Sequence, residues 1–158
     1  MNERVTAFLR AAFDAARTGM ADGKGGPFGA VVAKGDTLIA VGANRVVKDC
    51  DPTAHAEVTA LREACRRLET HVLEGCEIYC TTEPCPMCLS AIYWARVDRV
   101  WFAATREDAA RIGFDDAVIY REVSLDIRDR RLPMTRVVMD EAEALFDAWE
   151  KLPNKVPY

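Results

Sequence analysis

The order of strand-like and helix-like segments is the feature that most restricts how this chain can fold. A hairpin pattern comes first, and after it stretches with helical spacing alternate with short apolar, β-branched runs. The strand-like runs are residues 30–42, which turn back at Lys34-Gly35-Asp36, then 76–82, 97–105 and 134–139. Such an alternation favours a sheet covered by helices on both faces. The sequence therefore predicts an α/β protein, with one three-layer α/β/α domain over residues 1–158 around a five-stranded mixed, mostly parallel central sheet.

Helices are expected between and around these strands. They cover residues 3–20, 51–68, 86–97, 106–113, 115–123 and 140–152. The residues proposed to cap or start them are Asn2, Asp51 followed by Pro52, and Asp140. Residues 44–51 are expected to form a loop.

Charge and apolar runs restrict the partners of the chain. It has 21 Lys and Arg residues against 25 Asp and Glu residues, a formal net charge of −4. This balance argues against a duplex-binding protein, which needs a basic surface. No run of about 20 apolar residues could cross a membrane, and the amphipathic, charged residues 1–17 do not resemble a secretory signal. We therefore expect a cytoplasmic protein, in which paired cysteines indicate metal binding or catalysis more than disulfides.

Two short motifs contain the residues with metal chemistry: His55-Ala56-Glu57 and Cys85-Pro86-Met87-Cys88. Pro86 suits the first position of a helix, which places Cys85 at its N-cap and Cys88 in its first turn, where the helix dipole favours thiolates. His55 is expected in the first turn of another helix. Helix starts that follow strands gather at one sheet edge, so the three side chains can converge as zinc ligands. Three protein ligands leave the fourth position to water, and Glu57 can reach that water as an acid–base group.

The cysteines also allow other interpretations. Cys85 and Cys88 could form a redox pair, although the matching His-Ala-Glu motif argues against it. Cys80 could be a fourth zinc ligand, which would close the site. Otherwise the remaining cysteines are expected to pack in the core as small apolar residues; these are Cys50, Cys65, Cys76 and Cys80.

Together the two motifs resemble the signature H-x-E…P-C-x-x-C of the zinc nucleobase deaminases, in the cytidine deaminase-like superfamily. More closely, the chain is similar to bacterial guanine deaminases. The segments that carry this similarity are residues 25–32, Asn44, residues 51–62, 83–96 and 113–120, and the C-terminal Tyr158. The resemblance implies a cytidine deaminase-like fold. It also implies one zinc ion per subunit, with water or hydroxide as its fourth ligand, and hydrolysis of guanine to xanthine and ammonia in purine metabolism.

The resemblance also implies the roles of single residues. The metal ligands would be His55, Cys85 and Cys88, and the catalytic residues Glu57 and Asp116. The substrate-binding residues would be Phe28 and Trp94 packing on the ring, Asn44 and the backbone of Ala56 bonding the base, Asp116 at the guanine edge, and Tyr158 closing the pocket. Tyr158 would come from the partner subunit of a homodimer that exchanges its C-terminal segments.

Simpler interpretations and other functions stay open at this point. Phe28 and Asn44 could be turn residues, Trp94 a core residue, Asp116 part of a solvated helix cap and Tyr158 a frayed end. The chain could deaminate adenosine in tRNA, although its negative charge disfavours a polyanion, or act on cytosine, guanosine or an aminotriazine. A zinc-stabilised interaction module without catalysis would have four protein ligands.

Overall fold

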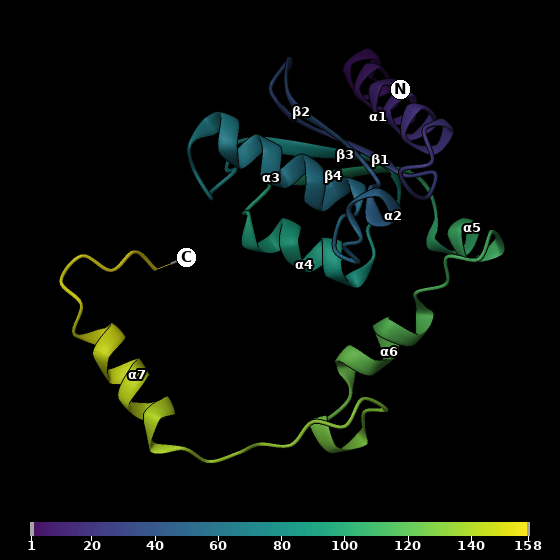
Figure 1. The fold of residues 1–158 in the computed structure, drawn as a ribbon. Helices are drawn as coiled ribbons and strands as arrows, with labels where there is room; N and C mark the ends of the chain where they lie inside the picture. The colour runs from purple at the N-terminus through teal and green to yellow at the C-terminus, as the bar shows by residue number, and fades with distance from the viewer. Residues whose placement is uncertain (1, 158) are drawn as a thin grey trace. The chain divides into compact units, whose positions relative to one another are not determined.

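The computed structural model describes residues 2–157 and divides into two compact units, Met1–Ala117 and Val118–Tyr158 (Figure 1). The first unit contains the sheet and the helices packed on it, and the second contains the helices drawn in pale green and yellow.

The sheet of the first unit has four strands in the order β2-β1-β3-β4. Their bounds are β1 Gly29–Lys34, β2 Thr37–Ala43, β3 Cys76–Thr82 and β4 Arg99–Ala104. Strand β1 pairs antiparallel with both β2 and β3, whereas β3 and β4 pair parallel. The expected hairpin is thus confirmed and the sheet is mixed. Three strands run in one direction and β1 runs against them.

The prediction of a fifth strand at residues 134–139 is wrong. This segment lies in the second unit and has no regular secondary structure. Val137 is 73% exposed and Val138 is 79% exposed. An apolar, β-branched run becomes a strand only where a neighbouring strand takes up its backbone hydrogen bonds, and among residues 2–157 no strand pairs with it.

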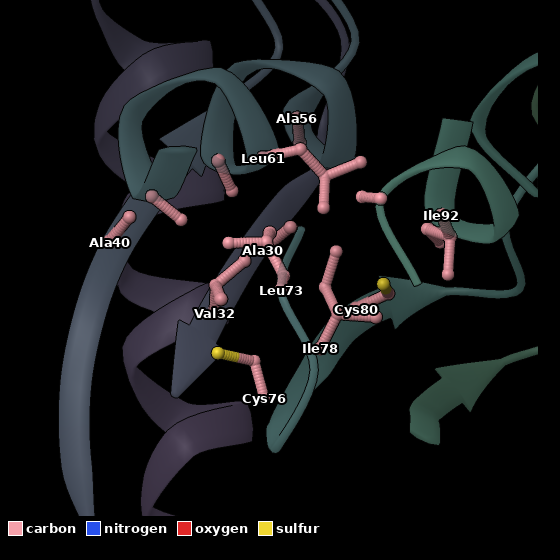
Figure 2. Packing of buried hydrophobic residues seen from close by; sticks show 13 residues of the cluster. Ala30, Val32, Ala40, Ala56, Leu61, Leu73, Cys76, Ile78, Cys80 and Ile92 are labelled. Atoms are coloured by element: carbon pink, nitrogen blue, oxygen red, sulfur yellow. The ribbon is translucent and has the colours of Figure 1, made fainter. Parts of the chain in front are cut away.

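Helices cover both faces of the sheet, as the predicted three layers require. On one face, α1 (Glu3–Ala21) packs Val5, Phe8 and Ala12 against β1 and β3. On the other face lie α3 (Ala56–Leu68) and α4 (Pro86–Trp94), whose buried side chains meet those of the sheet in one cluster (Figure 2). The residues labelled there are Ala30, Val32, Ala40, Ala56, Leu61, Leu73, Cys76, Ile78, Cys80 and Ile92.

The cysteine predictions hold for three of the four residues outside the two motifs. Cys76 and Cys80 are buried in the cluster of Figure 2, and Cys65 is half-buried against it. Cys50 is exposed, so its expected core position is wrong. It follows the short helix α2 (Val46–Asp49) with a left-handed backbone, φ 49°, on the surface of the unit. This helix replaces part of the loop expected at residues 44–51.

The helix starts differ from the expectations at two places. Helix α3 begins at Ala56 with His55 as its N-cap, and not at Pro52 after Asp51. The Asp51 carboxylate instead accepts hydrogen bonds from the backbone N–H and the hydroxyl of Thr53, both at 2.7 Å, which closes a turn before the helix. Helix α7 starts at Asp140 but its N-cap is Met139. The cap of α1 is as predicted, with Asn2 Oδ1 accepting from the Arg4 N–H at 3.0 Å.

The remaining helices are short. They are α5 Arg106–Arg111, α6 Ala117–Ser124, the 3₁₀ turn η1 Ile127–Asp129 and α7 Asp140–Glu150. Helices α6 and α7 bury none of their residues. None of the helices in the described part of the chain combines the length and the apolar composition needed to cross a bilayer.

Candidate metal centre

Strand directions bring the two motifs to one edge of the sheet. Gly29, the first residue of β1, pairs with Ala43, the last of β2, and Ala30 pairs with Cys80 near the end of β3. The chain therefore leaves β2 and β3 at the edge where β1 begins. From this edge it enters α3 and α4 through the loops that carry the motifs.

The two helix starts place three metal-binding side chains together. His55 is the N-cap of α3, Cys85 is the N-cap of α4, and Cys88 lies in the first turn of α4. His55 Nδ1 lies 3.6 Å from Cys85 Sγ and 3.5 Å from Cys88 Sγ. One ligand atom from each residue falls within 4.8 Å of the others.

These spacings agree with a tetrahedral zinc site. Zinc bonds of about 2.3 Å to sulfur and about 2.0–2.1 Å to nitrogen, at the tetrahedral angle, hold a nitrogen and a sulfur ligand about 3.6 Å apart. The nitrogen and sulfur donors are also those that zinc prefers. Cys80, considered above as a fourth ligand, does not join the cluster, which among residues 2–157 has three members. The donor set therefore has the open form of a catalytic site.

Hydrogen bonding within the cluster favours a thiolate. The bonds that Cys85 shares with Cys88 and His55 lower the pKa of its thiol to about 4, although burial opposes this. The bond to Cys85 and burial raise the pKa of Cys88. The bond to Cys85 also raises the pKa of His55. The cluster thus concentrates negative charge on Cys85, which suits it to bind a cation.

Glu57 lies in the first turn of α3 beside the ligands. It is 8% exposed and interacts with Cys88, and its burial raises the pKa of its carboxyl above the ordinary value. A buried carboxyl next to a metal site is positioned to accept and release protons.

Phe28, Asn44 and Ala56 also lie at this edge of the sheet. Asn44 follows β2 and is buried, and its backbone N–H donates to the Phe28 carbonyl at 3.0 Å. Ala56 is buried at the first position of α3, between His55 and Glu57. The structure thus brings together three of the residues that the sequence assigned to the base.

The other residues assigned to substrate binding are Asp116, Trp94 and Tyr158; of these, Asp116 and Trp94 differ in how near they lie to the metal ligands. Burial and the nearby Cys85 raise the pKa of Asp116, so this half-buried carboxyl lies within electrostatic reach of the ligands. Trp94 ends α4, is 64% exposed, and lies nine residues, about 14 Å along the helix axis, beyond Cys85. Tyr158 lies outside the described residues.

Sequence reasoning missed two residues near the site. Phe114 packs edge-on against Phe28, with ring centroids 4.9 Å apart and planes at 88°. Gly25 lies against the side chain of Asn44. Both residues fall in segments that the sequence had singled out, residues 25–32 and 113–120, but their contacts depend on the tertiary fold.

An α/β sheet edge with two cysteines, a histidine and a buried glutamate defines a zinc-dependent hydrolytic centre of the nucleobase deaminase type. Comparison with known families agrees. Residues 2–104 match the cytidine and deoxycytidylate deaminase zinc-binding region, and the chain belongs to this family of enzymes.

Relatives extend the similarity over the whole chain. It is 48% identical to the guanine deaminase of Bacillus subtilis, over 96% of this chain and 97% of that protein. The crystal structure of that guanine deaminase superposes with a TM-score of 0.94 at 47% identity, covering 100% of this chain and 99% of that one. The chain is also 45% identical to the tRNA-specific adenosine deaminase of Aquifex aeolicus, over 94% of this chain and 96% of that protein. A structure of the guanine deaminase from Nitrosomonas europaea has a TM-score of 0.66 at 37% identity, covering 70% of this chain and 64% of that one.

Proposed function

We propose that this protein is a hydrolase that converts guanine and water to xanthine and ammonia. The observation that carries the proposal is the open cluster of His55, Cys85 and Cys88 with the buried Glu57 beside it. The full-length similarity to guanine deaminases supports guanine as the base. We place the reaction in purine catabolism or salvage in the cytoplasm.

In the proposed reaction, zinc would be held by His55, Cys85 and Cys88. When bound there, zinc would lower the pKa of water toward about 7 and so would supply a nucleophile at neutral pH. Glu57 takes a proton from the water that attacks C2 and transfers it to a ring nitrogen. Glu57 then takes the remaining proton from the hydroxyl on C2 and delivers it to the amine as the C2–N bond breaks, so that the C2 carbonyl forms and ammonia leaves.

The proposed binding site holds the base against the cluster. Phe28 packs on its ring, and Phe114 supports the Phe28 ring from the side. Asn44 and the backbone of Ala56 form hydrogen bonds to the base. Asp116 binds the guanine edge and assists proton transfer, which its position near Cys85 supports.

We propose further that the protein works as a homodimer that exchanges its C-terminal segments, with Trp94 and the partner's Tyr158 completing the pocket. The second unit supports this, because it leaves large apolar side chains exposed, including Phe146 at 72% and Leu145 at 67%. About 40 residues do not form a stable core by themselves. A second copy of the chain would cover these side chains.

A tRNA adenosine deaminase is the second candidate, because the relative from Aquifex aeolicus covers nearly the whole chain. The net charge of −4 argues against it, since binding to RNA phosphates needs a basic surface. Cytosine, guanosine and aminotriazines are further candidate substrates.

A substrate panel tests the proposal. The zinc-loaded protein is mixed with guanine, guanosine, cytosine, an aminotriazine and a tRNA anticodon stem, and ammonia release is measured. Guanine should be the preferred substrate by kcat/KM. Turnover of the anticodon stem without turnover of guanine would reject the proposal.

A deletion tests whether the C-terminal residues 156–158 contribute to the binding site. Removal of residues 156–158 should raise KM for guanine far more than it lowers the unfolding temperature. An unchanged KM would exclude these residues from the site.

A further inference from the structure

The Asn44 side chain is held in one orientation by the backbone. Its Oδ1 accepts two hydrogen bonds, from the N–H of Gly26 and from the N–H of Val46, both at 3.2 Å. Two N–H donors can face only the oxygen of a carboxamide, so the positions of its oxygen and nitrogen are determined. Within residues 2–157 the Nδ2 group has no hydrogen-bond partner, and it is the polar end left for a ligand.

Gly25 provides the space for this orientation. A Cβ atom built at Gly25 would lie 2.1 Å from Asn44 Oδ1, and 3.0 Å from both Asn44 Cγ and the Asn44 backbone carbonyl oxygen, all inside van der Waals contact. The backbone of Gly25 is outside the left-handed region, so alanine is allowed there by conformation. The closest overlap of its methyl group would be with the end of a side chain that can rotate away, and the Asn44 carbonyl oxygen would need to shift by only a few tenths of an ångström. An alanine at this position would therefore turn the carboxamide out of place, with a local adjustment of the backbone beside Asn44.

We propose that Gly25 is a positioning residue for the reaction, which leaves room for the Asn44 carboxamide to direct its oxygen to the backbone and its NH2 group to the base. Asn44 is then an obligate hydrogen-bond donor. A base is accepted only if it presents an acceptor, a ring nitrogen or carbonyl oxygen, at this point. The inference rests on the proposed function, because it assigns Asn44 to the base.

A double-mutant cycle tests whether Gly25 acts through Asn44. The variants are Gly25→Ala, Asn44→Ala and the double variant, measured on whichever base of the panel the wild-type chain hydrolyses. Each single change should lower kcat/KM roughly 10- to 100-fold, the loss expected when a buried acceptor is left unpaired. The double variant should be little slower than Asn44→Ala, because the methyl group then has no carboxamide to displace and meets only the backbone carbonyl oxygen of residue 44.

Gly23→Ala is the matched control in the same loop. Gly23 has φ 66°, and a Cβ there meets nothing within 4 Å, so alanine strains the loop without contacting Asn44. This variant should keep kcat/KM within about 3-fold of the wild type. Equal losses in Gly23→Ala and Gly25→Ala, or multiplicative losses in the double variant, would overturn the positioning role.

Asn44→Asp tests the donor separately. The carboxylate still accepts the two backbone hydrogen bonds but presents an oxygen where the NH2 group was. We expect bound zinc to be retained and kcat/KM to fall at least as far as in Asn44→Ala. Wild-type turnover by Asn44→Asp would refute the donor assignment. Failure of the wild type to hydrolyse guanine would reject the proposed substrate alone, because the cycle then uses the base that is hydrolysed.

Discussion

Substitution of Gly42 in β2 by alanine should disturb the metal centre. The added methyl group would press on α3, which has His55 at its N-cap and Glu57 in its first turn. A Cβ at Gly42 in β2 would lie 2.2 Å from the Ala56 carbonyl oxygen and 2.6 Å from the Ala60 nitrogen, whereas ordinary contact begins at 3.4 Å. Both are backbone atoms of α3, so no rotamer change can relieve the overlap. The start of α3 must move by about 1 Å from the sheet. Overpacking of this kind costs about 1–3 kcal/mol of the free energy of unfolding.

The movement should reach the chemistry because Ala56 lies between His55 and Glu57. A misplacement of about 1 Å at a reacting group can cost about 100-fold in rate. We therefore expect Gly42→Ala to lower kcat/KM by 10- to 100-fold, as an order of magnitude, and to weaken zinc binding. Urea unfolding gives the stability, competition with a chelator gives the zinc affinity, and ammonia release gives the activity.

Gly35→Ala separates lost stability from lost geometry. Gly35 lies in the hairpin turn with φ 57°, and a Cβ there meets nothing within 4 Å. Alanine in this conformation costs roughly 1–2 kcal/mol but leaves α3 in place. Gly35→Ala should therefore lose stability and keep its activity. Normal zinc affinity and activity in Gly42→Ala would refute the reasoning, and equal activity losses in both variants would assign the effect to stability alone.

Other substitutions test the ligand set, the proton transfer and the sheet. Glu57→Gln should bind zinc normally but lower kcat at least about 100-fold, because an amide cannot carry the proton; normal turnover would disprove the role. Cys80→Ser should retain zinc by metal analysis whereas Cys85→Ser should lose it, and zinc loss in Cys80→Ser would mean that a fourth protein ligand closes the site. The hydrogen bond that Tyr79 donates lowers the pKa of Glu77. The Glu77 carboxylate therefore stabilises the fold fully above its ordinary pKa of about 4.3, and this stabilisation is lost as the pH falls through the lowered pKa. Thermal unfolding curves of the wild type and Glu77→Gln should differ at pH 7 and converge in acid, and a constant difference would contradict this.

The metal ligands could be predicted from the sequence because their chemistry depends on short motifs. Pro86 fixes the start of α4, and this start places Cys85 and Cys88 one helical turn apart. The alternation of strands and helices was sufficient to place His55 at the same sheet edge. These signals are local, and the fold contributes only the convergence of the three ligand side chains at one sheet edge.

Other features depend on partners that the local sequence does not reveal. Asp51-Pro52 has the pattern of a helix start. However, the Asp51 carboxylate accepts hydrogen bonds from Thr53, and the chain turns before α3 begins. Residues 134–139 have the composition of a strand, but within the described chain no neighbouring strand pairs with them. The contact of Gly25 with Asn44 joins residues from two loops, so no periodicity could indicate it.

His55 occupies a position where helices favour Ser, Thr, Asp or Asn, and its side chain makes no capping bond to α3. Serine there would supply the missing bond and stabilise the fold by about 1 kcal/mol, while removing one of three donors. The residue that is best for folding therefore differs at this position from the residue that is best for chemistry. Repeated selection of this protein for heat resistance alone would favour loss of the histidine, and would yield a more stable protein that no longer turns over its substrate.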